Sequence, residues 1–148
     1  MQEKKIAIGS DHAGFELKEK IKKNLEEFGY QITDFGTNST DSVDYPLIAK
    51  ALATSVSSKN PPKGILVCGT GIGMSIAANK IKGIIAAPAY DIETAKLSRL
   101  HNNSNILTLG GRTTDPTLAK EIVKVWLETD FEGGRHQRRI QEIRDLER

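Results

Sequence analysis

The stretch GILVCGTGIGM, residues 64–74, decides the fold. Its first five residues form a short apolar run, which is typical of a strand buried on both faces of a sheet. The glycines that follow permit a tight turn, and residues 71–81 are then predicted as a helix. A buried strand that leads through a glycine turn into a helix is the repeating unit of parallel α/β sheets.

The same alternation of strand and helix continues along the chain. Further strands are predicted over residues 6–8, 30–35, 84–89 and 106–109, and further helices over 14–29, 46–57 and 92–100 and from Thr114-Asp115-Pro116 onward. In the last of these helices the expected inner face is Leu118, Ile122, Val125 and Trp126. Five strands alternating with helices predict an α/β fold, with a parallel sheet covered on both faces and right-handed crossovers. The pattern alone does not determine the strand order.

The C-terminal tail stands outside this alternation. After Gly133-Gly134, residues 135–148 are predicted as a helix with Ile140, Ile143 and Leu146 along one side. Such a stripe must pack on its own domain or on a second copy. We favour the second copy, because the alternating core is complete without the tail. Residues 1–148 are therefore expected to form a single domain, with the tail, 131–148, at a dimer interface.

Composition narrows the class of protein. A chain of 148 residues with 38% hydrophobic and 27% charged residues fits one soluble domain. A net charge of +2 is too small to indicate nucleic-acid binding by itself, and no apolar run approaches the ~20 residues of a membrane span. The N-terminus lacks signal-peptide features, and one cysteine cannot form an internal disulfide. We expect a cytoplasmic protein without nucleic-acid or membrane partners.

Polar and glycine-rich segments follow four of the predicted strands. In open α/β sheets, ligands bind beyond the carboxyl ends of the strands. The segments there are Asp11-His12, residues 69–73, Tyr90-Asp91 and residues 110–112. The glycines of 69–73 allow backbone N–H groups to approach an anion, although a plain strand–helix turn has the same composition. No Lys-Ser/Thr pair follows, as a nucleotide-hydrolysing loop requires, and the dinucleotide fingerprint is incomplete.

Cys68 and the histidines are the candidate reactive groups. A thiol at the start of a helix can act as a base or nucleophile, but Cys68 equally fits a small buried hydrophobe. His12 and His101 fit either capping or functional positions, and His136 is expected to be a solvated residue of the tail. Three histidines and one cysteine form no recognisable ligand cluster in the sequence, so we expect no metal and no cofactor.

Two arginines in the tail could bind a phosphate. Arg135 and Arg139 are spaced i, i+4, which places them on one helix face. Paired arginines suit a phosphate, although a solvated basic face is the more common reading.

Several short motifs, in their order along the chain, resemble those of type B ribose-5-phosphate isomerase. This enzyme belongs to the family that includes galactose-6-phosphate isomerase subunits. The motifs are residues 9–14 (GSDHAG), 44–46 (DYP), 68–74 (CGTGIGM), 78–80 (ANK), 98–99 (SR), 101–102 (HN) and 133–136 (GGRH). Each is weak alone, but together they span nearly the whole chain. The resemblance implies a three-layer fold with a five-stranded parallel sheet in the order 2-1-3-5-4. It also implies a homodimer, sometimes a dimer of dimers, with active sites at the subunit interface.

The resemblance also implies roles for individual residues. Cys68 corresponds to the base that moves a proton between C2 and C1, and His101 to the residue that assists ring opening. Some members carry a glutamate where this chain has Met74, so the cysteine version of the mechanism is expected. Thr70 could move a proton between O1 and O2. Substrate binding is implied for Asp11, His12, Tyr45, Asn102, Arg112, Arg135 and Arg139, and for Gly69, Thr70, Gly71, Ile72 and Gly73 at the reacting end.

The expected reaction is the interconversion of D-ribose 5-phosphate and D-ribulose 5-phosphate, in the pentose phosphate pathway, through a cis-enediolate. The nearest alternative is an isomerase for a six-carbon sugar phosphate, such as allose 6-phosphate or galactose 6-phosphate. A non-catalytic sugar-phosphate-binding protein is a second alternative, which the presence of both Cys68 and His101 disfavours. A nucleotide-binding module is a third, disfavoured by the incomplete glycine fingerprint.

Overall fold

A five-stranded parallel sheet forms the centre of the molecule. The computed structural model describes residues 4–147. The strands are Lys5–Ser10 (β1), Gln31–Asp34 (β2), Gly64–Cys68 (β3), Ala86–Pro88 (β4) and Ile106–Gly110 (β5). They pair in parallel in the order β2-β1-β3-β5-β4, as the family resemblance implied.

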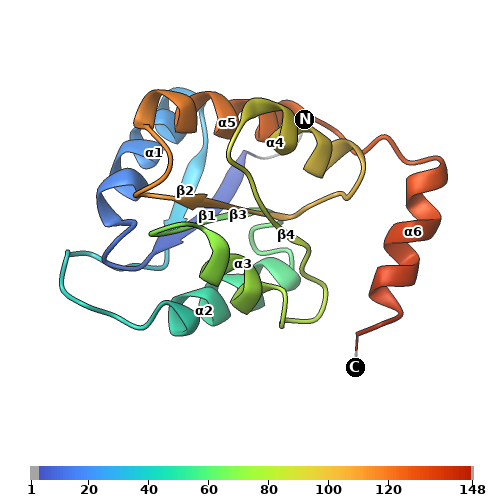
Figure 1. Cartoon of the computed structure of the whole chain (residues 1–148), viewed down its shortest axis with the longest axis horizontal. Coiled ribbons are helices and arrows are strands. Elements are labelled where there is room, and N and C mark those ends of the chain that lie inside the picture. Colours follow the sequence, from blue (N-terminus) through green and yellow to red (C-terminus); the bar gives the residue numbers. More distant parts are fainter. Residues whose placement is uncertain (1–3, 148) are drawn as a thin grey trace.

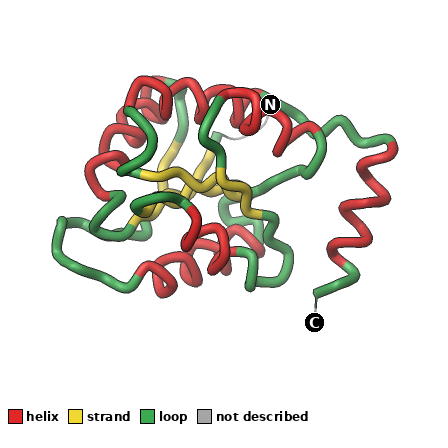
Figure 2. The backbone as a smooth tube through the Cα atoms, in the orientation of Figure 1, coloured by secondary structure: helices red, strands yellow, loops and turns green. Residues whose placement is uncertain are grey.

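Helices cover both faces of the sheet and produce three layers (Figures 1 and 2). One face carries α1 (Phe15–Glu27), α4 (Ile92–Leu100) and α5 (Pro116–Glu128). The other carries α2 (Tyr45–Ser57) and α3 (Ile72–Ala78). The final helix, α6 (Arg135–Arg144), lies at one end of the molecule, beside these layers rather than within them.

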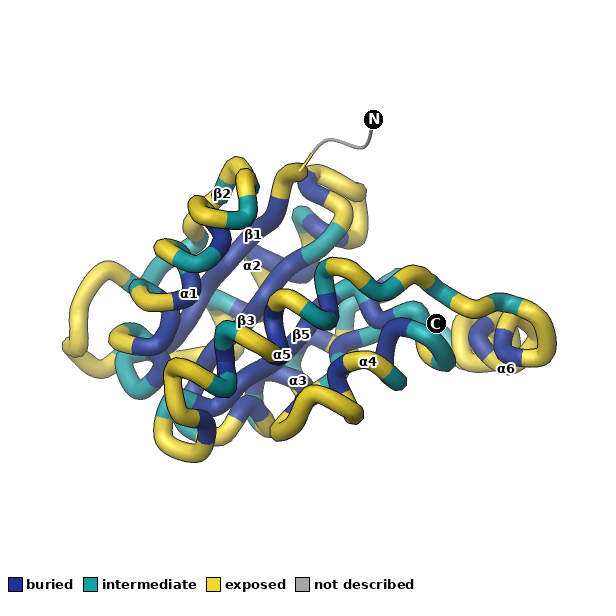
Figure 3. The backbone as a smooth tube through the Cα atoms, turned by 90° about the horizontal axis from the view of Figure 1, so that it is seen from above, coloured by how far each residue is buried: buried dark blue, intermediate teal, exposed yellow. Residues whose placement is uncertain are grey.

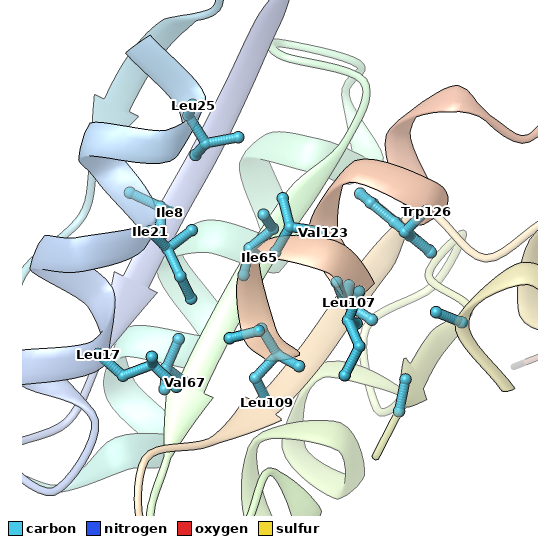
Figure 4. Packing of buried hydrophobic residues seen from close by; sticks show 14 of the residues in the cluster. Ile8, Leu17, Ile21, Leu25, Ile65, Val67, Leu107, Leu109, Val123 and Trp126 are labelled. Atoms are coloured by element: carbon cyan, nitrogen blue, oxygen red, sulfur yellow. The ribbon is translucent and has the colours of Figure 1, made fainter. Parts of the chain in front are cut away.

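Side chains of β3 alternate between two hydrophobic cores. Ile65 and Val67 belong to the core beneath α1 and α5, together with the fully buried Trp126 (Figure 4). Leu66 and Cys68 belong to the core beneath α2 and α3. Alternate residues of a strand point to opposite faces of a sheet, so this register directs the Cys68 thiol toward the α2 and α3 layer.

Some elements are shorter than the sequence predicts. α3 ends at Ala78 rather than at residue 81. Beyond it, the Asn79 side chain accepts from the Ala86 N–H at 2.7 Å and donates to the Ala86 carbonyl at 2.9 Å. These two hydrogen bonds tie the end of α3 to the first residue of β4. β4 occupies Ala86–Pro88 rather than 84–89.

The buried face of α5 also differs from the prediction. Ala119 and Val123 are fully buried beside Ile122 and Trp126, whereas Leu118 and Val125 lie at its margins and are only half-buried.

α6 is amphipathic, but only part of its stripe is covered. Ile140 is buried, whereas Ile143 is 43% and Leu146 79% exposed. Near its end, the Glu147 carboxylate accepts from the Gly83 N–H at 3.1 Å. The helix ends at Arg144, four residues earlier than the predicted helix, whose last residue, 148, lies outside the described range. Figure 3 shows how much of α6 is exposed.

Candidate active site

Cys68 ends β3 at the carboxyl edge of the sheet, where the glycine turn begins. Its side chain is buried, and the Gly71 N–H donates to Sγ at 3.2 Å. Gly71 has φ +84°, a left-handed conformation that favours glycine, and an added Cβ would lie 3.1–3.2 Å from Leu109 backbone atoms. The turn therefore needs glycine here to fold tightly around the sulfur.

Two predicted substrate-binding residues lie against this turn. A Cβ on Gly73 would come within 2.6–2.8 Å of the Tyr45 ring and hydroxyl, so the ring packs on the glycine. A Cβ on Gly69 would lie 3.4 Å from a guanidinium nitrogen of Arg112. The absence of side chains at residues 69 and 73 thus makes room for Tyr45 and Arg112 against the turn that follows Cys68.

Asp11 and His12 follow β1 at the same edge. The backbone N–H of Asp11 donates to the Val67 carbonyl at 3.1 Å, and its carboxylate accepts from the Gly14 N–H at 3.0 Å. His12 Nδ1 accepts from the Val43 N–H at 3.1 Å. In a neutral imidazole this leaves Nε2 as the proton-bearing nitrogen, able to donate to an anionic ligand.

The loop that holds His12 is itself tied down by a buried lysine. Lys18 Nζ, fully buried, donates to both carboxylate oxygens of Asp34 at 2.8–2.9 Å and to the Thr37 carbonyl at 2.7 Å. Although burial opposes it, donation from Lys18 and Lys22 holds the pKa of Asp34 below its usual value. The ion pair therefore persists at neutral pH and holds the start of the loop that reaches His12.

Thr70 and Ile72 are exposed on the outer side of the turn. Thr70 Oγ1 accepts from the Ile72 N–H at 3.2 Å. The hydroxyl of Tyr90 donates to the Thr70 carbonyl at 2.8 Å, which ties the loop after β4 to the turn. Sequence reasoning marked the Tyr90 loop only by its position after a strand and gave Tyr90 no role.

A second group of residues gathers around His101. His101 caps the C-terminus of α4, and its ring stacks on that of His136 with centroids 4.3 Å apart. Nε2 of each histidine lies 4.0 Å from Oε2 of Glu132. Asn102, Arg135 and Arg139 are exposed in the neighbouring segments.

The prediction for His136 was wrong. The residue is only 6% exposed rather than solvated, because it lies on the inner side of α6 against His101. Burial, and then the neighbouring His101, lower the pKa of His136. The histidines also come together with Glu132, the one set of side chains within residues 4–147 with the geometry to hold a metal ion, whereas the sequence suggested no such cluster.

The residues described so far form two groups. The first lies around the turn after Cys68 and the second around His101, and a single chain does not bring them together. Cys68 pairs with Gly110 at the carboxyl edge of the sheet, whereas the Gly64 N–H bonds to the Asn105 carbonyl at the amino edge. α4 runs back from β4 to β5, so His101 at its end belongs to the amino edge. Figures 1 and 3 show α6 at the far end of the molecule from the turn that follows β3.

The sequence and the fold of this chain both match known proteins. The family model described as Ribose/Galactose Isomerase matches residues 6–143. The chain belongs to this family.

Relatives of the ribose/galactose isomerase family match almost end to end. Ribose-5-phosphate isomerase B from Escherichia coli is 47% identical over 97% of this chain and 97% of its own. The crystal structure of a ribose 5-phosphate isomerase from Thermotoga maritima is 52% identical, covers 98% of this chain and 100% of its own, and has a TM-score of 0.95. D-erythrulose-4-phosphate isomerase from Pectobacterium atrosepticum is 42% identical over 93% of this chain and 91% of its own.

In this family member, the first group supplies a thiol, backbone N–H groups and a cation, whereas the second supplies an imidazole and two guanidinium groups. The N–H groups of a helix's first turn have no intrahelical acceptor, so those at the start of α3 could stabilise an oxyanion, apart from the Ile72 N–H, which donates to Thr70 Oγ1. Across the part of the chain that the structure describes, no helix combines the length and the apolar character that crossing a membrane requires.

Proposed function

We propose that this chain is a ribose-5-phosphate isomerase that uses Cys68 as its base. The observation that carries the proposal is the buried Cys68 sulfur at the start of the glycine turn. Arg112 and Tyr45 pack against this turn, and relatives of the chain carry the name of this enzyme. The reaction is an aldose–ketose isomerisation and needs only proton transfers, so no cofactor is part of the proposal.

The chemistry moves one proton between neighbouring carbons. In the open-chain aldose, the Cys68 thiolate takes the proton from C2, and the C–H electrons form the C1–C2 double bond of a cis-enediolate. Backbone N–H groups of the turn stabilise the negative charge on O1. Thr70 moves a proton from O2 to O1, and the thiol returns its proton to C1, which leaves the carbonyl at C2. The geometry supports this scheme because the Gly71 N–H donates to the sulfur, and Thr70, whose Oγ1 accepts from the Ile72 N–H, belongs to the same turn.

The remaining roles belong to the second group of residues. His101 is proposed to open the furanose ring, since an imidazole can take a proton from the anomeric hydroxyl and deliver one to the ring oxygen. Arg135 and Arg139 are proposed to bind the phosphate. His12 and Arg112, from the first group, are proposed to bind it with them. Asp11, Tyr45 and Asn102 are proposed to contact the sugar.

The separation of the two groups supports a homodimer in which each site takes one group from each subunit. Arg135 and Arg139 are exposed residues of α6, which lies at the far end of the molecule from the turn after β3 (Figure 1), so we propose that a second copy completes the set. The exposed Ile143 and Leu146 of the tail, 131–148, give this interface an apolar part. We propose one domain per chain, 1–148, a dimer that can pair into a dimer of dimers, and a cytoplasmic location consistent with its single cysteine.

A substrate comparison tests the function. Formation of ribulose 5-phosphate from ribose 5-phosphate is measured against isomerisation of allose 6-phosphate, galactose 6-phosphate and D-erythrulose 4-phosphate. We expect kcat/KM to be highest for ribose 5-phosphate. A higher kcat/KM for a six-carbon or four-carbon substrate would reassign the substrate, and binding without turnover of any of them would identify a sugar-phosphate-binding protein instead.

A further inference from the structure

Two histidines and a glutamate converge where α4 meets α6. His101 comes from the end of α4, Glu132 from the segment between α5 and α6, and His136 from the first turn of α6. One ligand atom from each residue lies within 4.8 Å of the other two. Nε2 of each histidine lies 4.0 Å from the same carboxylate oxygen of Glu132.

The buried nitrogen of His136 is the second observation. Its Nε2 has no hydrogen-bond partner among residues 4–147, although the residue is only 6% exposed. Most buried polar atoms have such a partner, and exceptions call for an explanation. This nitrogen faces Glu132 and adjoins the stacked ring of His101, so a group bound between the three side chains would satisfy it.

We propose that His101, Glu132 and His136 form a binding site for a divalent transition-metal ion of the zinc type. Two imidazoles and one carboxylate suit zinc, copper, nickel or cobalt, whereas magnesium and calcium prefer all-oxygen sites. The His101 side chain is 38% exposed and that of Glu132 is 50% exposed, so water can reach the ion as a fourth ligand.

The required movements are small. Metal–ligand bonds of about 2.0–2.2 Å in a tetrahedron place neighbouring ligand atoms roughly 3.4 Å apart. The 4.0 Å separations must therefore close slightly, and the imidazole rings must rotate out of their stack so that their lone pairs converge. The carboxylate of Glu132 is free to follow because it is exposed, while the bond from the Glu132 N–H to the Leu100 carbonyl, at 3.1 Å, keeps its backbone beside α4.

A bound ion would switch off the isomerase. It would occupy the Nε2 lone pair of His101 and thereby remove the base proposed for ring opening. This consequence rests on the proposed function, whereas binding of the ion does not. We expect zinc to inhibit reversibly and a chelator to restore the activity.

Cobalt(II) titration of the full-length protein tests the site directly, because tetrahedral cobalt absorbs visible light. We expect such a spectrum to saturate at one ion per chain and zinc to displace the cobalt. Glu132→Gln and His136→Gln should each weaken cobalt binding by about tenfold or more, since each removes a ligand. Glu142→Gln, an exposed change of the same type on α6, and Cys68→Ala, which removes the thiol, should bind as the wild type does.

Undiminished binding by both Glu132→Gln and His136→Gln, or loss of binding in Cys68→Ala, would overturn the proposal. Circular dichroism and a melting curve check folding, and Glu132→Gln alters an exposed side chain, so it decides the matter if His136→Gln unfolds. Zinc inhibition, measured for Glu132→Gln, His136→Gln and Glu142→Gln against the metal-free rate of each variant, should weaken in parallel with cobalt binding. Binding at these residues without inhibition would support the metal site and count against ring opening by His101.

Discussion

Cys68 combines burial with a defined donor. The thiol closes a β-strand, belongs to the core beneath α2 and α3, and receives the Gly71 N–H at 3.2 Å. A donor aimed at sulfur stabilises the thiolate, which is the form that acts as a base. An ordinary core cysteine needs no such donor, so the turn supports the catalytic interpretation over the purely structural one.

Replacing the thiol tests this interpretation. Cys68→Ala should lower kcat by about 10²–10⁴-fold, the usual contribution of a positioned general base, while the KM or the binding of an inert sugar phosphate stays close to normal. Steady-state kinetics and calorimetry measure the two effects. Met74→Leu, a conservative change at a buried position of α3 in the same core, serves as the control for packing. Near-normal turnover by the alanine variant would remove the cysteine from the mechanism.

Lys63 links stability to pH. Burial, and then the nearby Arg99, lower its pKa from 10.5 to about 8, so the unfolded chain binds the proton more tightly than the folded one. Stability contributed by this residue should therefore rise as the pH increases from about 8 to 10.5 and stay level below that window. Chemical denaturation across this range should show that the free energy of unfolding of the wild type rises relative to that of Lys63→Met. Lys124→Met, at an exposed position on α5, should show no such trend, and an identical trend in both variants would contradict the assignment.

Individual side chains were predictable where the strand pattern placed them. The pattern of 64–74 was enough to locate Cys68 at the mouth of a turn, because strand ends and glycines follow local rules. It failed for His136, since the burial of a tail residue depends on which surface the tail meets. The hydrogen bond of Tyr90 was not predicted for a similar reason, because it joins loops that lie twenty positions apart in the sequence.

At the scale of elements, α6 is the segment whose role depends most on its surroundings. Its inner side is covered at His136 and Ile140, while Arg135 and Arg139 extend from exposed positions. The sequence predicted this helix correctly, and Arg135 and Arg139 both lie on it. It could not predict where the helix docks, because an amphipathic stripe specifies burial but not the partner that provides it.

The proposed phosphate anchor leads to a kinetic prediction. Arg139→Ala should raise KM by about 10- to 100-fold, because a hydrogen bond to a charged group is worth roughly 1.5–3 kcal/mol. Loss of kcat should be smaller and should reflect poorer orientation of C1 and C2 toward the base. Arg138→Ala, the adjacent exposed arginine, is the matched control, and similar kinetics for the two variants would argue that α6 contributes only general positive charge.

At the scale of the whole molecule, the topology separates groups that the chemistry must unite. Alternation predicted five parallel strands, but the order β2-β1-β3-β5-β4 depended on resemblance, since each crossover can pass over different numbers of strands. The same topology sends α4 back to the amino edge and leaves His101 away from Cys68. No local pattern encodes that separation, which becomes visible only when the chain is folded.

Mixing two inactive variants tests whether a second copy completes the site. Cys68→Ala damages the first group of residues and His101→Asn the second. If each site takes one group from each subunit of a two-fold dimer, a mixed dimer contains one doubly damaged site and one intact site. Random co-assembly of equal amounts should then restore about one quarter of wild-type activity, since half of the dimers are mixed and each has one working site. The two variants are unfolded and refolded together, and activity is compared with that of each variant refolded alone. Sites built within one chain would give no recovery, because every site in the mixture would then carry one of the two lesions.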